Sequence, residues 1–165
     1  MPRPPIPRNS SAPAGRRSWT TSRATWSGHE RRPVTQVRDV APHELPAVWR
    51  LLCAQGWAHR IGSPADLARL VAASQRSVVA LNDQGQVVGF ARAITDGLSN
   101  GYLSIVVVDP ACRRQGLGTR LVQHLMGEDA SITWVLRAGR EGAEAFFSRL
   151  GFRVSTVAME RPRQR

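Results

Sequence analysis

The part of this sequence with the clearest capacity for chemistry is a glycine-containing turn between an apolar run and an amphipathic run. The apolar run is 106–108, Gly116 and Gly118 lie in the turn, and apolar side chains at helical spacing follow in 121–125. Glycines allow the backbone to come close to a ligand. A helix that begins directly after such a turn directs its free N–H groups and the positive end of its dipole at one point. We therefore expect a phosphate-binding turn, with a diphosphate-bearing molecule as its ligand.

Two well-known phosphate-binding loops do not fit this turn. The P-loop needs a lysine after its second glycine, and all 23 basic residues of this chain are arginines. The dinucleotide-binding fingerprint needs a glycine three residues after Gly118, where this chain has Leu121. What remains is the pattern Arg113-x-x-Gly116-x-Gly118. For a pattern this short, a glycine turn that only caps a helix is the commoner explanation.

A second motif follows about 30 residues after the first and changes the interpretation. It reads Ala143-x-x-Phe146-Phe147-x-x-Leu150-Gly151-Phe152. Together with Arg113-x-x-Gly116-x-Gly118 and the Val-Val-Val-Asp-Pro that precedes it, this motif resembles the GCN5-related N-acetyltransferase (GNAT) superfamily. The resemblance covers Val34 to about Met159.

The resemblance implies acetyl-CoA as the co-substrate, and we expect no metal. It implies that the fourth strand separates from the fifth, and that the backbone of Val106, Val107 and Val108 pairs with the pantetheine arm. It also implies that the pyrophosphate is held by the loop and helix start, which comprise Arg113, Arg114, Gln115, Gly116, Leu117, Gly118 and Thr119.

The residues at the usual catalytic positions of the superfamily differ here. Many members have a glutamate base in the fourth strand and a tyrosine acid in the fourth helix, where this chain has Ser104 and Phe147. We take Asp96 and Tyr102 as substitute catalytic candidates. The surroundings of Asp96 resemble a subgroup that includes plastid arylalkylamine and protein-lysine acetyltransferases, and the two-residue strand period places Tyr102 on the face of Ser104. Two alternatives stay open: Asp96 as an ordinary turn residue, and deprotonation by water, with positioning supplying most of the rate.

The function implied by the resemblance is transfer of the acetyl group of acetyl-CoA to a primary amine by direct attack of the amine on the thioester. Our first expectation is an amine of a small molecule. The alternatives are a lysine or N-terminal amine of a protein, and an acyl-CoA-binding sensor module without turnover. Ser104 and Phe147 are the residues that favour the sensor.

The segments that must position these residues alternate between strand-like and helix-like patterns from Val34 onward. Apolar runs and two-residue alternation predict strands at 34–40, 77–81, 86–94, 102–108, 132–136 and 152–159. Apolar side chains at three- and four-residue spacing predict helices at 42–56, 63–71, 116–126 and 141–150. This order predicts an α/β (α+β) domain. The resemblance implies a mixed, mostly antiparallel central sheet with splayed fourth and fifth strands, flanked by about four helices.

The charge of the chain lies mostly at its ends. The 165 residues carry a net charge of +11, whereas 34–160 holds thirteen arginines and eleven acids, a net charge of +2. Residues 1–33 have seven arginines, one acid and no hydrophobic periodicity, which predicts a disordered extension. We expect an N-acetyltransferase domain at 34–160 and a basic tail at 161–165. Nucleic acid is an expected partner only through the N-terminal arm.

The composition limits the other classes of protein. No apolar run approaches the roughly 20 residues that cross a bilayer, so we expect no membrane partner. Cys53 and Cys112 are too few for a disulfide framework and have no metal-ligand spacing. We expect a cytoplasmic protein. A homodimer stays open, and the sequence does not identify the acceptor.

Overall fold

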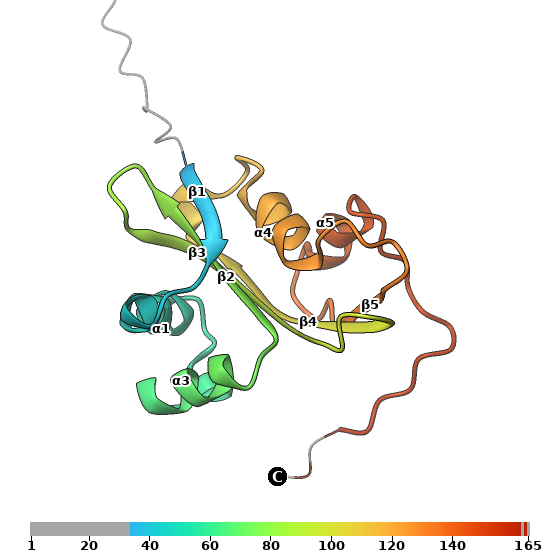
Figure 1. Cartoon of the computed structure of the whole chain (residues 1–165). Helices are drawn as coiled ribbons and strands as arrows, with labels where there is room; N and C mark the ends of the chain where they lie inside the picture. Colours follow the sequence, from blue (N-terminus) through green and yellow to red (C-terminus); the bar gives the residue numbers. More distant parts are fainter. Residues whose placement is uncertain (1–33, 163, 165) are drawn as a thin grey trace, which may run out of the picture. The chain divides into compact units, whose positions relative to one another are not determined.

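The computed structural model describes residues 34–162 and 164, and within them five strands form one sheet (Figure 1). In sheet order the strands are β1 (Val34–Asp39), β2 (Arg76–Asn82), β3 (Val87–Thr95), β4 (Asn100–Val108) and β5 (Thr133–Leu136). Neighbouring strands are antiparallel except for β4 and β5, which are parallel. The predicted mixed, mostly antiparallel sheet is confirmed.

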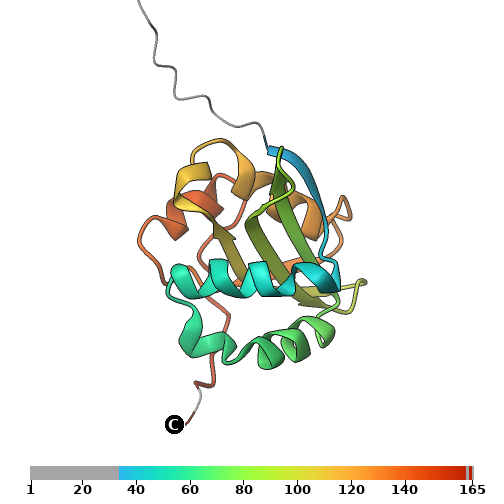
Figure 2. The same cartoon turned by 90° about the vertical axis from the view of Figure 1, so that its left-hand side faces the viewer.

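Helices cover both faces of this sheet. They are α1 (Leu45–Ala54), α2 (Ala58–Ile61), α3 (Pro64–Ala72), α4 (Leu117–Met126) and α5 (Ala143–Ser148), with 3-10 turns at Pro42–Glu44 and Pro110–Cys112. Figures 1 and 2 show α1 and α3 on one side of the sheet and α4 and α5 on the other. The sequence predicted about four helices, and the difference is the single turn α2 in the connection between α1 and α3.

The core consists of two apolar clusters, one on each side of the sheet. On one side Val48, Leu52 and Leu67 from α1 and α3 pack against buried strand residues such as Phe90. On the other side the stripe of α4 packs against the sheet, and its four buried residues are Leu117, Leu121, Val122 and Leu125. Side chains three and four residues apart share one helix face, which is why this spacing in the sequence predicted the buried stripe.

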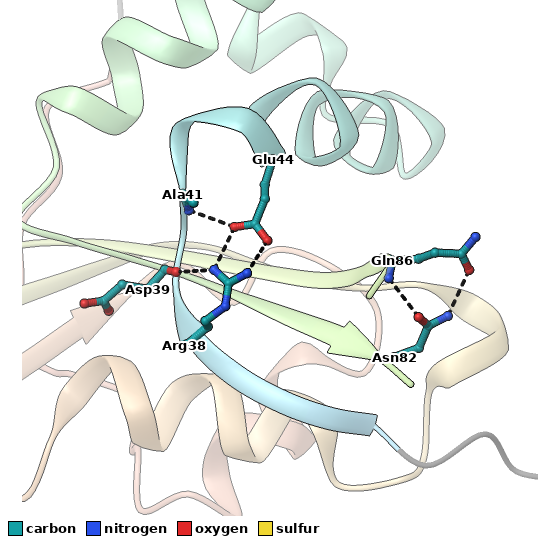
Figure 3. A network of polar contacts seen from close by, with 6 residues as sticks. All are labelled: Arg38, Asp39, Ala41, Glu44, Asn82 and Gln86. Carbon is teal, nitrogen blue, oxygen red and sulfur yellow. Dashed lines mark hydrogen bonds and ion pairs between the residues drawn. The ribbon is translucent and has the colours of Figure 1, made fainter. Parts of the chain in front are cut away.

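Polar side chains fix the connections that follow β1 and β2 (Figure 3). The Asn82 carboxamide oxygen accepts from the backbone N–H of Gln86 (2.8 Å) and so closes the β2–β3 turn. After β1, Arg38 donates to both carboxylate oxygens of Glu44 (2.7 and 2.9 Å), and Glu44 also accepts from the N–H of Ala41 (2.7 Å). Local contacts of this kind replace the backbone hydrogen bonds that a turn leaves unmade.

The feature that shapes the candidate site is the separation of β4 from β5. Only Asn100–Leu103 pairs with β5, so residues 104–108 have no partner on that side. Ser104 is the extra residue of a β-bulge, because Arg92 pairs with Ile105 and the next residue of β3 pairs with Leu103. A bulge bends its strand and re-aims side chains.

The predicted last strand, 152–159, is wrong. The structure has no strand in this segment, and it leaves Val154, Val157 and Met159 78%, 88% and 99% exposed. Phe152 still packs edge-on against Phe147, with ring centres 5.6 Å apart. The alternation that follows has no neighbouring strand to pair with, and alternation alone does not form a ladder.

The predicted disordered extension, 1–33, lies outside the described residues, as do two residues of the predicted basic tail, 163 and 165. In the described part of the chain, no helix has both the length and the apolar character needed to cross a membrane.

Candidate functional site

A cavity of about 1040 Å³ opens where β4 leaves β5. Its walls are β4, the loop that follows β4, the start of α4, helix α5 with the residues before it, and the α1–α2 connection. The predicted site residues that line it are Val106, Val107, Val108, Arg113, Arg114, Gly116, Leu117, Gly118 and Thr119. The structure therefore brings nine of the ten predicted cofactor-binding residues together around one cavity.

The N-terminus of α4 presents free donors to this cavity. Gly116 has a φ of 75°, and no side chain caps the helix. The first helical hydrogen bond runs from the N–H of Arg120 to the carbonyl of Gly116 (3.1 Å). The N–H groups of 117–119 therefore have no partner within the helix, and they carry its partial positive charge. This end of the helix can accept an anion.

Gly118 lies in the first turn of α4, where α5 comes close. A Cβ at this position would lie 3.1 Å from Cζ of Phe146, which is tighter than an ordinary van der Waals contact. The missing side chain thus lets α5 pack near the helix end and leaves the backbone N–H groups uncovered. A backbone left bare in this way fits a bulky phosphate ligand.

The cavity is lined by more positive than negative charge. Its charged residues are Arg113, Arg114, Arg140, Arg149 and Glu141. Arg114 has a φ of 61° and is the one non-glycine residue with positive φ in the described chain. A backbone held in this conformation at a non-glycine residue stores strain, and such strain gathers at functional sites.

Gln55, at the end of α1, contacts two arginines of the cavity, and no pattern in the sequence indicated this role. Its side-chain oxygen accepts from Arg113 (2.6 Å), and its backbone carbonyl accepts from Arg140 (2.9 Å). Arg113 also donates to the carbonyl of Val108 (3.0 Å). These contacts span 58 and 85 residues of sequence, so no local pattern could have revealed them.

Gln115 is the one predicted cofactor-binding residue that does not line the cavity. Its side chain is half-buried, and its amide nitrogen donates to the carbonyl of Ala111 at 3.5 Å. This contact points the side chain back to the 3-10 turn at Pro110–Cys112.

Phe147 lines the cavity at the position where many superfamily members have a tyrosine. It packs edge-on against Phe146 and Phe152, with ring centres 4.9 and 5.6 Å apart. An aromatic ring without a hydroxyl has no proton to donate. Protonation of a leaving thiolate here needs water or another group.

Asp96 lies away from the cavity, in the exposed turn between β3 and β4. Its carboxylate accepts from the backbone N–H groups of Leu98, Ser99 and Asn100 at 2.9 to 3.0 Å, and from the hydroxyl of Ser99. The hydrogen bonds from Asn100, Ser99 and Leu98 hold the pKa of Asp96 well below its usual range. A carboxylate stabilised in this way is a weak base. The geometry is that of a turn residue and gives no support to Asp96 as the catalytic base.

Tyr102 does not line the cavity either. Leu103, between Tyr102 and Ser104, is buried with the α4 cluster. Tyr102 therefore points to the face covered by α1 and α3. Ser104 is reached from that same face, since its hydroxyl accepts from Arg92 (3.2 Å). The shared face that the sequence predicted for Tyr102 and Ser104 agrees with this geometry.

Among the described residues, no group of three or more His, Cys, Asp or Glu side chains could hold a metal ion.

A mixed sheet that opens between two parallel strands, with an uncapped helix N-terminus and a basic cavity at the opening, defines the GNAT class of acetyltransferase folds. The family model for an acetyltransferase (GNAT) domain matches residues 73–154. This chain belongs to the GNAT superfamily.

Curated relatives and solved structures agree with this membership. The chain is 32% identical to the probable acetyltransferase TAP2 of Glycine max over 101 residues, which are 53% of this chain and 37% of the relative. It is 31% identical to the peptidyl-lysine N-acetyltransferase YjaB of Escherichia coli over 77 residues, which are 47% of this chain and 49% of the relative. The chain thus spans half or less of the curated relatives that it matches.

One solved structure with the same fold contains coenzyme A. It is the GNAT family N-acetyltransferase YhbS of Escherichia coli in complex with CoA, which superimposes with a TM-score of 0.54 at 23% identity. The match covers 73% of this chain and 69% of that one.

Proposed function

We propose that this protein transfers the acetyl group of acetyl-CoA to a primary amine of a small molecule. The observation that carries the proposal is the cavity at the β4–β5 opening. One wall is an unpaired strand edge, and another is an uncapped helix N-terminus beside four arginines. An extended amide-containing arm suits the first wall, and a diphosphate suits the second.

The roles of the binding residues follow from this arrangement. The backbone of Val106, Val107 and Val108 pairs with the pantetheine arm as a further strand would. The N–H groups of 116–119 and the side chain of Arg114 bind the pyrophosphate. Arg113 holds the loop in place through Gln55 and Val108, while Gln115 supports it from behind.

The site promotes the reaction by placing the amine next to the thioester and by supplying polar backbone groups of β4. The nitrogen of a neutral amine forms a bond to the thioester carbonyl carbon, and the carbon–sulfur bond breaks. A backbone N–H of β4 stabilises the negative charge that develops on the oxygen. The proton lost by the amine passes to water, and the thiolate takes a proton from water, because Phe147 has none to give. Placing the two reactants together supplies much of the rate in such a site.

A second candidate acceptor is a lysine side chain of a protein, because the matched relative YjaB is named a peptidyl-lysine N-acetyltransferase. A third reading is an acyl-CoA sensor that binds without turnover. The residues that favour it are Ser104 and Phe147, which lack the acid–base groups of many superfamily members.

The test is calorimetric titration of acetyl-CoA into the full chain, followed by thiol release with a panel of small amines, polyamines and lysine peptides. Gly118→Trp fills the gap in front of α4 and should abolish binding. The matched control is Gln123→Trp, which places the same side chain at an exposed position of the same helix. Binding with amine-dependent thiol release establishes the enzyme, whereas binding without release under all acceptors supports the sensor. No binding of acetyl-CoA, or equal binding by Gly118→Trp, would contradict the assigned site.

We further propose that the protein works in the cytoplasm. The sequence has only two cysteines, too few for a disulfide framework, and such low cysteine usage suits a reducing compartment.

A further inference from the structure

The middle of β3 holds a buried positive charge without an acidic partner. Arg92 is 5% exposed. Its Nε donates to the hydroxyl of Ser74 (2.8 Å), and its Nη1 donates to the hydroxyl of Ser104 (3.2 Å). None of the ion pairs between described residues includes Arg92. A buried charge that meets only neutral hydroxyls is costly, and such charges are ordinarily paired.

The guanidinium has donors left for a ligand. It carries five N–H groups, and the two serine hydroxyls use two of them. The fully buried polar atoms without a partner in the described chain are Trp57 Nε1, Ser77 Oγ and Trp134 Nε1. Arg92 Nη2, which makes no hydrogen bond to a described residue, is not among them, so this nitrogen is not fully buried. Its N–H groups and the second N–H of Nη1 lie in one guanidinium plane, a geometry that a carboxylate accepts in two parallel hydrogen bonds.

An apolar platform lies beside this cation. Ile94 pairs with Tyr102, and Tyr102 pairs with Val135, so the three side chains form one row across β3, β4 and β5. Ile94 and Val135 are 45% and 44% exposed. Arg92 is two residues before Ile94 on the same strand, and residues two apart share a face. Burial lowers the pKa of Arg92, and the nearby Tyr102 opposes this shift, so the phenol lies within electrostatic range of the guanidinium.

This surface lies next to the place where the proposed reaction occurs. Ser104, which contacts Arg92, is in the β4 bulge two residues before Val106. Val106 begins the strand segment to which the proposed function assigns the pantetheine arm. The face with Arg92 is the one that α1 and α3 cover, whereas α4, which would hold the pyrophosphate, lies on the opposite face. An acceptor bound on the platform therefore approaches the thioester from the side away from α4.

We propose that Arg92, Ile94, Tyr102 and Val135 form the acceptor site, and that the acceptor is a small amine with a carboxylate and an apolar group, as in an apolar amino acid. This inference rests on the proposed acetyltransferase function and names its substrate class. The carboxylate binds the free donors of Arg92, the apolar group lies on the platform, and the amine nitrogen points to the thioester. The amide bond forms as the carbon–sulfur bond breaks, with the amine proton passing to solvent and the thiolate protonated from it.

The test compares acceptors that differ only in the carboxylate. Thiol release by the full chain is measured with phenylalanine, 2-phenylethylamine, phenylalaninamide and a lysine peptide. We expect a kcat/KM for phenylalanine at least about tenfold above that for the two forms without the carboxylate, because a bidentate charge-assisted pair is lost in them. Arg92→Gln should bring the ratio close to one, and Arg92→Lys should retain part of it. The control is Arg76→Gln, a half-buried arginine that donates to the backbone carbonyls of Leu125 and Met126.

A second variant keeps the test valid if Arg92→Gln does not fold. Ile94→Glu changes an exposed residue and places a negative charge beside Arg92. It should reverse the preference in favour of 2-phenylethylamine. If the wild-type protein prefers 2-phenylethylamine or the lysine peptide, the acceptor proposal is overturned. The proposed acetyltransferase function is then still supported, because thiol release depends on an amine.

A binding measurement separates the two proposals when no acceptor turns over. The affinity of the full chain for N-acetylphenylalanine, the product of this acceptor, is measured by calorimetry with and without Arg92→Gln. Binding that depends on Arg92 in the absence of turnover supports the site and contradicts the enzyme. Absence of both turnover and Arg92-dependent binding overturns the acceptor proposal.

Discussion

The guanidinium of Arg140 lies 4.5 Å from the ring centre of Trp57 and donates to the carbonyl of Gln55 at 2.9 Å. Both side chains line the candidate cofactor cavity. Arg140 immediately precedes the segment that leads into α5, so this contact joins α5 to the α1–α2 connection across the cavity. A stacked and hydrogen-bonded cation is held ready to meet a phosphate, which reduces the ordering needed on binding.

Removing this cation should weaken acetyl-CoA binding. We expect Arg140→Gln to lower the affinity about five- to twentyfold, or about 1–2 kcal/mol, because one charge-assisted hydrogen bond and its field are lost. Calorimetric titration measures the affinity. Arg137→Gln is the control, since Arg137 is exposed, pairs with Glu160 (3.0 Å) and does not line the cavity. Equal affinities for the two variants would remove Arg140 from the site.

The close approach of Gly118 and Phe146 predicts that substitutions at these two positions have coupled effects on acetyl-CoA binding. A Cβ on residue 118 meets Cζ and Cε2 of Phe146 at 3.1 and 3.3 Å, so Gly118→Ala must displace α5 slightly. We expect weaker acetyl-CoA binding for Gly118→Ala and recovery when Phe146→Leu is added. A double-mutant cycle on the binding free energy checks this, with an expected coupling of about 1 kcal/mol. Additive effects would show that the two residues do not share the space in front of α4.

The backbone of Arg114 predicts opposite effects on stability and binding. Its φ of 61° is unfavourable for arginine and tolerated by asparagine. Arg114→Asn should raise the free energy of unfolding by up to about 1 kcal/mol while it lowers acetyl-CoA affinity. Denaturant titration and calorimetry measure the two quantities. A variant with a lower free energy of unfolding as well as a lower affinity would show that the backbone of Arg114 is not strained in the folded protein.

The sequence predicted the strand–turn–helix around Gly116 because each part of it has a local cause. Continuous apolar residues predicted the buried β4, a glycine at the turn permitted the positive φ, and helical spacing predicted the buried face of α4. Each of these sequence patterns lies within the strand, turn or helix that it predicts. Together with the second motif, they were sufficient to place nine of the ten predicted residues around one cavity.

The sequence did not predict the features that depend on distant partners. Gln55 is an ordinary polar residue at a helix end until the fold brings Arg113 to it. Arg92 lies in an apolar run, and only the pairing of β3 with β4 shows that it meets Ser104 and no acid. The strand predicted at 152–159 failed for the same reason, because a strand requires a neighbour that its own alternation does not specify.

The turn geometry of Asp96 predicts that the residue supports the fold and not the chemistry. Asp96→Asn should leave kcat and its pH profile unchanged, because the carboxylate accepts hydrogen bonds from backbone N–H groups of the turn and does not line the cavity. It should lower the melting temperature at neutral pH. Because the folded-state pKa is depressed, the contribution of Asp96 is present above its ordinary pKa and is lost as the pH falls toward the folded value. A large loss of kcat with unchanged stability would restore Asp96 as the base.

The last prediction concerns the contact between Arg38 and Glu44, which fixes the entry to α1 (Figure 3). Glu44 is 6% exposed, and burial alone would raise its pKa. The hydrogen bond and charge of Arg38, together with the N–H of Ala41, outweigh burial and lower the pKa below the ordinary 4.5. The unfolded chain therefore binds more protons at this residue in mild acid. Glu44 stabilises the fold above about pH 4.5, and this stabilisation is lost as the pH falls through the lower folded pKa.

Glu44→Gln should therefore reduce the free energy of unfolding by about 2 kcal/mol at pH 7, because charge-assisted hydrogen bonds are replaced by neutral ones. The difference from wild type should shrink as the pH is lowered below 4.5, since the wild-type carboxylate is then protonated as well. Denaturant titrations between pH 3 and pH 7 measure both effects. Glu128→Gln, at an exposed glutamate after α4, is the control and should change neither quantity. A constant difference across this range would mean that Glu44 stabilises the turn through packing, without any contribution from its charge.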